Sequence, residues 1–122
     1  MYSKNRKNLV RRTKEEAPVR RGSGSVFRDM GFSTSTAAEL GAKSLLIDAI
    51  GDTIEHRKLT QKEAAKLCDT DQPTLSKVLR GRMESVTIDR LAGWLTALGR
   101  TVEIRVRPYN GSKKEGHLVA VF

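Results

Sequence analysis

The residues between 72 and 82 carry the side chains of this sequence that are best suited to a chemical task. A glutamine, two hydroxyls and three cations occur there without an acidic residue among them: Gln72, Thr74, Ser76, Lys77, Arg80 and Arg82. Glutamine pairs well with adenine, lysine contacts guanine, and hydroxyls and arginines hold phosphates. The set is typical of a segment that reads the major groove of DNA. The alternative is an ordinary amphipathic helix with a solvated polar face.

Two short helices joined by a turn are needed to present these side chains. Thr60 and Glu63 have the spacing of a capping box, so the first helix begins near Gln61. Small residues follow in that helix, which allows a second helix to cross it at close range. Pro73 fits the first turn of the second helix, where the backbone N–H has no helical partner. The pattern predicts a helix-turn-helix unit over residues 59–81.

The turn between the two helices is acidic, with the sequence Asp69-Thr70-Asp71. Aspartate tolerates a left-handed backbone better than most residues, and Asp71 is placed to cap the second helix. Cys68, just before the turn, has no histidine near it in sequence. We therefore expect Cys68 to fill the core rather than to act as a nucleophile.

The composition favours a polyanionic partner. The 122-residue chain has 23 Lys and Arg against 14 Asp and Glu, and its net charge is +9. Such an excess indicates nucleic acid or an anionic membrane surface as the partner. No run of about 18 apolar residues is present to span a membrane, and the single cysteine excludes a disulfide framework or a thiolate zinc cluster. We expect one domain in a cytoplasmic protein.

Catalysis would need a different set of residues. Phosphate or zinc chemistry requires a glycine loop or clustered histidines and acids, whereas His56 and His117 lie far apart without such neighbours. An RNA-binding protein would use aromatic stacking platforms, but the few aromatic residues are dispersed. We expect no enzymatic activity, no metal and no cofactor, and double-stranded DNA is the expected partner.

Charge and periodicity divide the chain into three parts. Residues 1–24 carry eight Lys or Arg and few large apolar side chains, which predicts a basic disordered tail, with a DNA-contacting arm as the alternative. Residues 25–100 carry the helical domain. Apolar residues recur there at helical spacing between 40 and 54, in one long helix or two shorter ones, and again between 88 and 98. Trp94 is expected to complete that core.

Residues 101–122 change to the period of a β-strand. Val102, Ile104 and Val106 alternate with charged residues, which predicts a half-buried strand, and residues 117–122 suit a returning strand. A lone hairpin is only marginally stable in water, so it must pack on the helices or pair with another chain. A second copy of the chain is the simplest partner, which makes the three apolar residues a candidate dimer strand.

The stretch LTQKEAAKLCDTDQPTLSKVLRG, residues 59–81, resembles the helix-turn-helix of XRE/Cro-like regulators. The likeness lies in the Leu-Thr-Gln opening, the paired alanines, the Gln-Pro-Thr-x-Ser run and the closing Arg-Gly. VFRDMGF at 26–32 and SVTIDRLAGWLTALGRTVEIRVRP at 85–108, in this order, resemble the small HigA-like antitoxins. The resemblance implies a mainly α fold, a five-helix lambda-repressor-like helix-turn-helix domain with a C-terminal β-strand or hairpin.

The resemblance also implies a bacterial homodimer that binds a palindromic operator, represses its own operon and neutralises a RelE/HigB-like toxin. Carried over by position, it assigns base contacts to four residues: Gln72, Pro73, Thr74 and Lys77. It assigns contacts with the DNA backbone to four others: Gln61, Ser76, Arg80 and Arg82. The acidic turn departs from the family pattern of glycine, a large aliphatic residue and serine, so we expect modest operator affinity or an unusual sequence preference.

An apolar group near residue 30 is the candidate toxin-docking patch, and it comprises Val26, Phe27, Met30 and Phe32. The alternative is that these side chains cover the protein's own helices. A stand-alone regulator without a toxin would keep the same sequence features. A protein-interaction module that has lost DNA binding is a further alternative, and the acidic turn motivates it.

Overall fold

Five α-helices make up most of the structure, a computed structural model that describes residues 21–22, 24–109, 111, 116 and 118–122. The helices are α1 (Ser25–Asp29), α2 (Thr34–His56), α3 (Gln61–Leu67), α4 (Gln72–Leu79) and α5 (Ile88–Ala97). A short 3-10 helix, η1 (Met83–Ser85), lies between α4 and α5. The expected five-helix, mainly α fold is confirmed.

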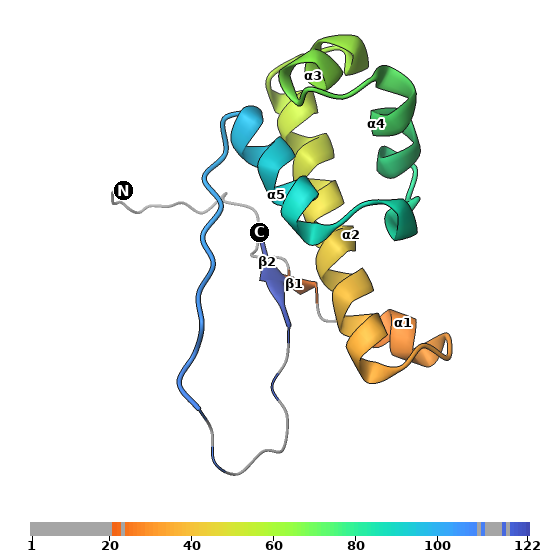
Figure 1. The fold of residues 1–122 in the computed structure, drawn as a ribbon, viewed down its shortest axis with the longest axis vertical. Helices are drawn as coiled ribbons and strands as arrows, with labels where there is room; N and C mark the ends of the chain where they lie inside the picture. Colours follow the sequence, from red (N-terminus) through yellow and green to blue (C-terminus); the bar gives the residue numbers. More distant parts are fainter. Residues whose placement is uncertain (1–20, 23, 110, 112–115, 117) are drawn as a thin grey trace.

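The long helix α2 is the centre of the fold. Figure 1 shows α1 at the N-terminal end of α2, while α3, α4 and α5 surround its C-terminal half. Of the two forms expected for this region, the structure has a single helix of 23 residues. Gly51 does not interrupt it, and the end of α4 packs beside this glycine, where Leu79 Cδ2 would lie 3.9 Å from an added Cβ.

The core lies between the C-terminal half of α2 and the three helices around it. Ile50, Leu75 and Leu91 are completely buried, and each connects a different helix to this core. Trp94 and Cys68 are buried in the same cluster, as expected from the sequence. Burying a large apolar side chain contributes about 1.5–3 kcal/mol, so this cluster holds α4 and α5 on α2.

Side-chain caps set where four of the helices begin. Ser33, Thr60, Asp71 and Thr87 each accept a hydrogen bond from the backbone N–H three residues further on. These bonds satisfy donors that the first turn of a helix leaves without a partner. The start of α1 depends instead on Gly24, whose φ of +80° and contact with the Ala37 backbone leave no room for a Cβ atom.

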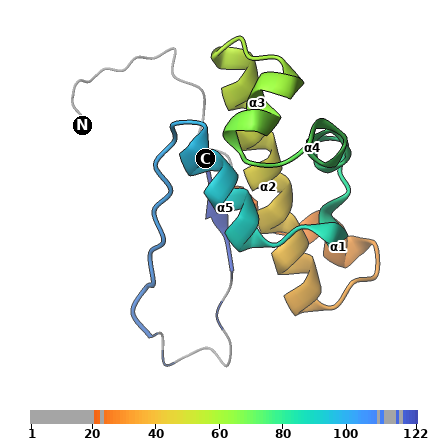
Figure 2. The same cartoon turned by 45° about the horizontal axis from the view of Figure 1, so that its top comes forward.

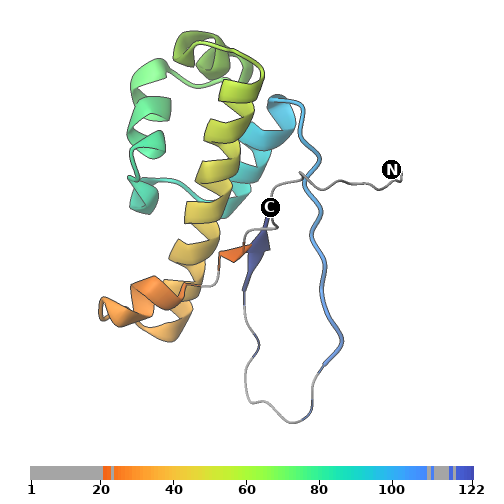
Figure 3. The ribbon, with the colours of Figure 1, turned by 180° about the vertical axis from the view of Figure 1, so that it is seen from behind.

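Of the β-strand or hairpin expected at the C-terminus, the structure has a single short strand among the residues that it describes. Strand β2 (Ala120–Val121) lies within the predicted returning segment, but it pairs antiparallel with β1 (Arg21–Gly22), with Arg21 opposite Val121. The predicted tail of residues 1–24 thus overlaps the sheet at 21–22, and its residues 1–20 lie outside the described part of the chain. The sheet brings the two ends of the described chain together beside α2 (Figure 3).

The strand expected over residues 101–107 is not formed within the single chain. This segment is extended and Val102 is half-buried, but Ile104 and Val106 are 87% and 90% exposed. The alternation of apolar and charged residues indicated the period of a strand but carried no information on its pairing partner, and β2 pairs with β1 instead.

Candidate nucleic-acid interface

The start of α3 is fixed by the capping box that the sequence predicts. The Thr60 hydroxyl accepts from the Glu63 N–H at 3.0 Å, and the Glu63 carboxylate accepts from the Thr60 N–H at 2.8 Å. Gln61 is therefore the first residue of α3, half-buried at the helix end. Backbone N–H groups at such an end attract a phosphate, which suits Gln61 to a contact with the DNA backbone.

Asp71 fixes the start of α4. Its carboxylate accepts from the Thr74 N–H at 2.8 Å, and Pro73 occupies the first turn of the helix. The hydrogen bonds from Thr74 lower the pKa of Asp71, and the nearby cations Lys77 and Arg90 lower it further. Asp71 is thus a charged cap at neutral pH, and it holds the first turn of α4 in place.

The exposed face of α4 carries the side chains that the sequence singled out. Leu75 and Val78 anchor the opposite face in the core. Gln72, Pro73, Lys77 and Arg80 are exposed, whereas Thr74 and Ser76 are half-buried at its side. The Arg80 guanidinium donates to the Ser76 hydroxyl at 2.6 Å, which links two of the predicted phosphate contacts. The helix therefore presents hydrogen-bonding groups and positive charge without an acidic residue.

The segment after α4 is tied to α2 by a buried lysine. Lys43 is only 6% exposed, and its Nζ donates to the Met83 carbonyl at 3.1 Å. The same Nζ pairs with Glu39 at 3.1 Å. Arg82, which is exposed, directly precedes Met83. Lys43 thereby positions the backbone that carries this predicted phosphate contact.

The acidic turn has a cationic neighbour that the sequence did not indicate. Asp69 adopts a left-handed backbone, with φ of +56°. The Arg90 guanidinium donates to the Thr70 hydroxyl at 3.4 Å and lies 5.4 Å from the Trp94 ring centroid. Because Arg90 belongs to α5, 20 residues from Thr70, no local spacing predicts the contact. Arg90 partly offsets the negative charge of the turn.

Comparison with known proteins agrees with this geometry. Residues 26–107 match a family model described as a helix-turn-helix domain. The chain belongs to this helix-turn-helix family. A solved structure described as an XRE-family transcriptional regulator is similar, with 29% identity and a TM-score of 0.61, over 67% of this chain and 92% of that one. No significant match was found among curated proteins.

The family match, the fold and the exposed face of α4 together identify the helix-turn-helix protein as a DNA-binding regulator of transcription. This agrees with the expectation of a DNA-binding protein. Within the described residues, no group of three or more His, Cys, Asp or Glu is placed to hold a metal ion. None of the helices in that part of the chain is long and apolar enough to cross a membrane.

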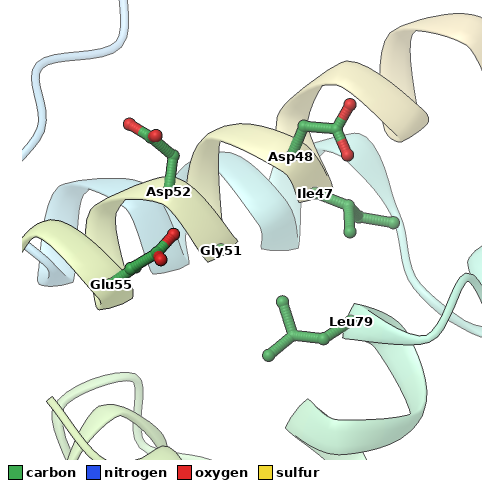
Figure 4. Close-up of a pocket in the computed structure, with 6 residues that line it drawn as sticks. All are labelled: Ile47, Asp48, Gly51, Asp52, Glu55 and Leu79. Atoms are coloured by element: carbon green, nitrogen blue, oxygen red, sulfur yellow. The ribbon is translucent and has the colours of Figure 1, made fainter.

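An acidic depression borders the helix-turn-helix unit where α2 meets the end of α4. Figure 4 shows Asp48, Asp52 and Glu55 along α2, with Ile47 of α2 and Leu79 of α4 lining the same hollow. Three carboxylates spaced by four and three residues share one side of a helix. Their charge repels phosphate, so this hollow is an unfavourable surface for a DNA duplex.

The cysteine next to the turn is confirmed as a core residue. Cys68 is buried, and its thiol lies 3.8 Å from the Trp94 carbonyl. Burial raises the pKa of the Cys68 thiol, which keeps it protonated at neutral pH. A protonated, buried thiol is a poor nucleophile, so Cys68 contributes to packing between α3 and α5.

The remaining predicted residues lie away from α4. Val26 and Met30 are 64% and 66% exposed at α1, and Phe32 is also exposed. Phe27 is half-buried and meets Phe32 edge-to-face at 6.3 Å. Figures 1 and 2 place α1 at the end of α2 opposite α3, so this apolar patch and the α3 start are well separated.

Proposed function

We propose that the protein is a sequence-specific repressor that binds a palindromic operator as a homodimer through α4 of each copy. The observation that carries this proposal is the exposed face of α4, which combines amide, hydroxyl and cationic groups with a rigid buried face. In such a dimer the two α4 helices would lie about 34 Å apart, one turn of DNA. Each would enter the major groove of one half-site.

In this proposal the first turns of α4 read the bases. Gln72 pairs with adenine, Lys77 contacts guanine, Thr74 adds a hydroxyl, and Pro73 touches a thymine methyl group. Each good bidentate contact contributes about 1–3 kcal/mol of discrimination. The Asp71 cap supports the role of these residues, because it fixes the backbone from which they project.

The ends of the two helices hold the DNA backbone. Gln61 at the start of α3 meets one phosphate, and Ser76, Arg80 and Arg82 meet others at the end of α4. The Arg80 to Ser76 hydrogen bond pre-orients this pair, and the Lys43 to Met83 bond steadies the backbone next to Arg82. Phosphate contacts of this kind give affinity and register without sequence information.

We further propose that the protein is the antitoxin of a type II toxin–antitoxin pair and represses its own operon. The support is the exposed apolar patch of Val26, Met30 and Phe32, together with the half-buried Phe27. Apolar side chains exposed side by side are typical of a protein-binding surface. A RelE/HigB-like toxin would dock on this patch, at the opposite end of α2 from α3.

Binding to the DNA upstream of the gene tests the repressor proposal. In a gel-shift assay, Gln72→Ala and Lys77→Ala are each expected to weaken binding about tenfold, the effect of one lost base contact. Arg28→Ala is the matched control, because it removes one positive charge from α1, away from α4. Unchanged binding by both α4 variants would refute the assignment of α4 as the recognition helix.

Co-expression tests the antitoxin role separately. The product of a neighbouring gene should arrest growth when expressed alone, and co-expression of this protein should restore growth. Met30→Glu places a charge in the exposed patch, so it should abolish this rescue while the gel shift stays unchanged. If no neighbouring product is toxic, the protein is a stand-alone regulator and the antitoxin proposal fails.

A further inference from the structure

Residues 101–109 form an extended segment in which Val102 is half-buried against the core, while the other apolar side chains are left in solvent. Ile104, Val106 and Tyr109 are 87%, 90% and 88% exposed. Figures 1 and 2 place this segment on the opposite side of α2 from α4. Large apolar side chains exposed together mark an interaction surface, and this one leaves the DNA-binding face of α4 uncovered.

The backbone of the segment is also without strand pairing. Within the described part of the chain, no backbone–backbone hydrogen bond joins residues 101–107 to another segment. An extended chain with free N–H and C=O groups is a template for a further β-strand. Pro108 has no N–H to donate and closes this template at its C-terminal end.

The sequence of the segment is complementary to itself. If two copies pair antiparallel about Ile104, Val102 of each copy lies opposite Val106 of the other, so all the apolar side chains share one face. On the other face, Glu103 of each copy lies opposite Arg105 of the other. These two side chains lie 3.9 Å apart within one chain and are 78% exposed, so both are accessible to the second copy.

Other registers lack this complementarity. A two-fold axis through residue 103 of the paired strands places the two copies of Glu103 opposite each other, and a two-fold axis through residue 105 does the same with the two copies of Arg105. Like charges directly opposite destabilise a strand pair. An axis at residue 102 places Ile104 opposite Arg100 of the other copy, and an axis at residue 106 places Ile104 opposite Pro108. The axis at Ile104 alone keeps apolar residues together and pairs opposite charges.

We propose that the partner of residues 101–107 is the same segment of a second copy, paired antiparallel with Ile104 on the two-fold axis. This inference deepens the proposed homodimer by naming its interface and register. The resulting two-stranded ribbon joins the domains on the side away from α4. Both recognition helices therefore remain free to bind DNA.

Charge exchange in the full-length protein tests the register. Glu103→Arg or Arg105→Glu sets like charges opposite each other twice in the dimer, so sedimentation equilibrium should give a dimer dissociation constant raised roughly tenfold or more. The double variant Glu103→Arg/Arg105→Glu should restore the dimer. A wild-type protein that stays monomeric, single variants that dimerise normally, or a double variant as weak as the singles would overturn the proposal.

Cysteine cross-linking tests the position of the axis. Ile104→Cys places two thiols opposite each other, and mild oxidation should give a covalent dimer. Val106→Cys is the control, because its two copies lie four residues apart along the strands, about 13 Å, which is too far for a disulfide. The native Cys68 is buried and present in both variants. Equal cross-linking of the two variants would overturn the register.

These experiments separate the interface from the proposed function. If the wild-type protein dimerises and shifts its operator while Glu103→Arg changes neither property, the strand interface is wrong and the repressor proposal stands. If the strand variants behave as expected but Gln72→Ala and Lys77→Ala bind DNA normally, the interface stands and the assignment of α4 fails.

Discussion

Lys43 joins α2 to the segment after α4, and its replacement tests whether this link stabilises the domain. Its Nζ lies 3.1 Å from the Met83 carbonyl, and the side chain is 8% exposed. Lys43→Met keeps a chain of similar length and removes the donor. A hydrogen bond to a charged group contributes about 1.5–3 kcal/mol, and a half-exposed ion pair with Glu39 adds at most about 0.5 kcal/mol.

Two effects reduce the expected loss. The Val86 N–H donates to the same Met83 carbonyl at 3.4 Å, so this acceptor keeps one partner in the variant. Removing the ammonium also relieves part of the desolvation cost of burying a charge. We therefore predict that Lys43→Met lowers the free energy of unfolding by about 1–2 kcal/mol, or Tm by roughly 5–10 °C for a domain of this size.

Urea and thermal unfolding measure this change, and Glu39→Gln is the control. Glu39→Gln removes the ion pair but keeps the Lys43 to Met83 hydrogen bond, so this variant should lower the free energy of unfolding by less than about 0.5 kcal/mol. Lys43→Met should also weaken DNA binding, because Arg82 directly precedes Met83. Equal stability of Lys43→Met and the wild type, or equal losses in both variants, would refute the reasoning.

Three further predictions concern α4 and its turn. Leu75→Ala should lower the free energy of unfolding by about 3 kcal/mol in urea, because Leu75 is fully buried and its loss leaves a cavity; a loss below about 1 kcal/mol would contradict the packing described. Asp69→Gly should raise stability by roughly 0.5 kcal/mol through relief of the left-handed φ. Both Asp69→Gly and Asp69→Asn should raise DNA affinity in a filter-binding assay, because each removes a carboxylate from the turn. Unchanged affinity in both variants would count against the expectation that the acidic turn weakens DNA binding. Hydrogen bonds from Thr74 lower the pKa of Asp71, so the Asp71 cap stabilises the protein near neutral pH and loses this effect as the pH falls below about 4. Thermal unfolding of Asp71→Asn should therefore show a smaller loss of stability over that pH range than the wild type. Identical pH profiles for the variant and the wild type would argue against the cap.

The helix-turn-helix unit was predictable because its determinants are local. Thr60 and Glu63 act across three residues, Asp71 caps the helix that it precedes, and Pro73 fits only a first turn. The burial of Leu75 follows from helical spacing alone. Each of these signals lies within one or two turns of the residue that it positions, so the sequence alone contains it.

Contacts between distant segments were not predictable in the same way. The Arg90 to Thr70 and Lys43 to Met83 bonds span 20 and 40 residues, and neither leaves a spacing pattern in the sequence. Strand β1 is only two residues long and lies in a highly charged stretch, where the period of a strand cannot be detected. The pairing of β1 with β2 depends on how the chain ends meet beside α2, which is a property of the folded domain.

The discrimination between operator and unrelated DNA tests the central claim most directly. The measurement is the ratio of dissociation constants for the two duplexes at fixed salt, for the wild type, Gln72→Ala and Arg80→Ala. We predict that Gln72→Ala reduces this ratio about tenfold by losing a base contact, whereas Arg80→Ala weakens binding to both duplexes alike and leaves the ratio nearly unchanged. A ratio that Gln72→Ala leaves intact would contradict the account, because α4 would then not read the sequence.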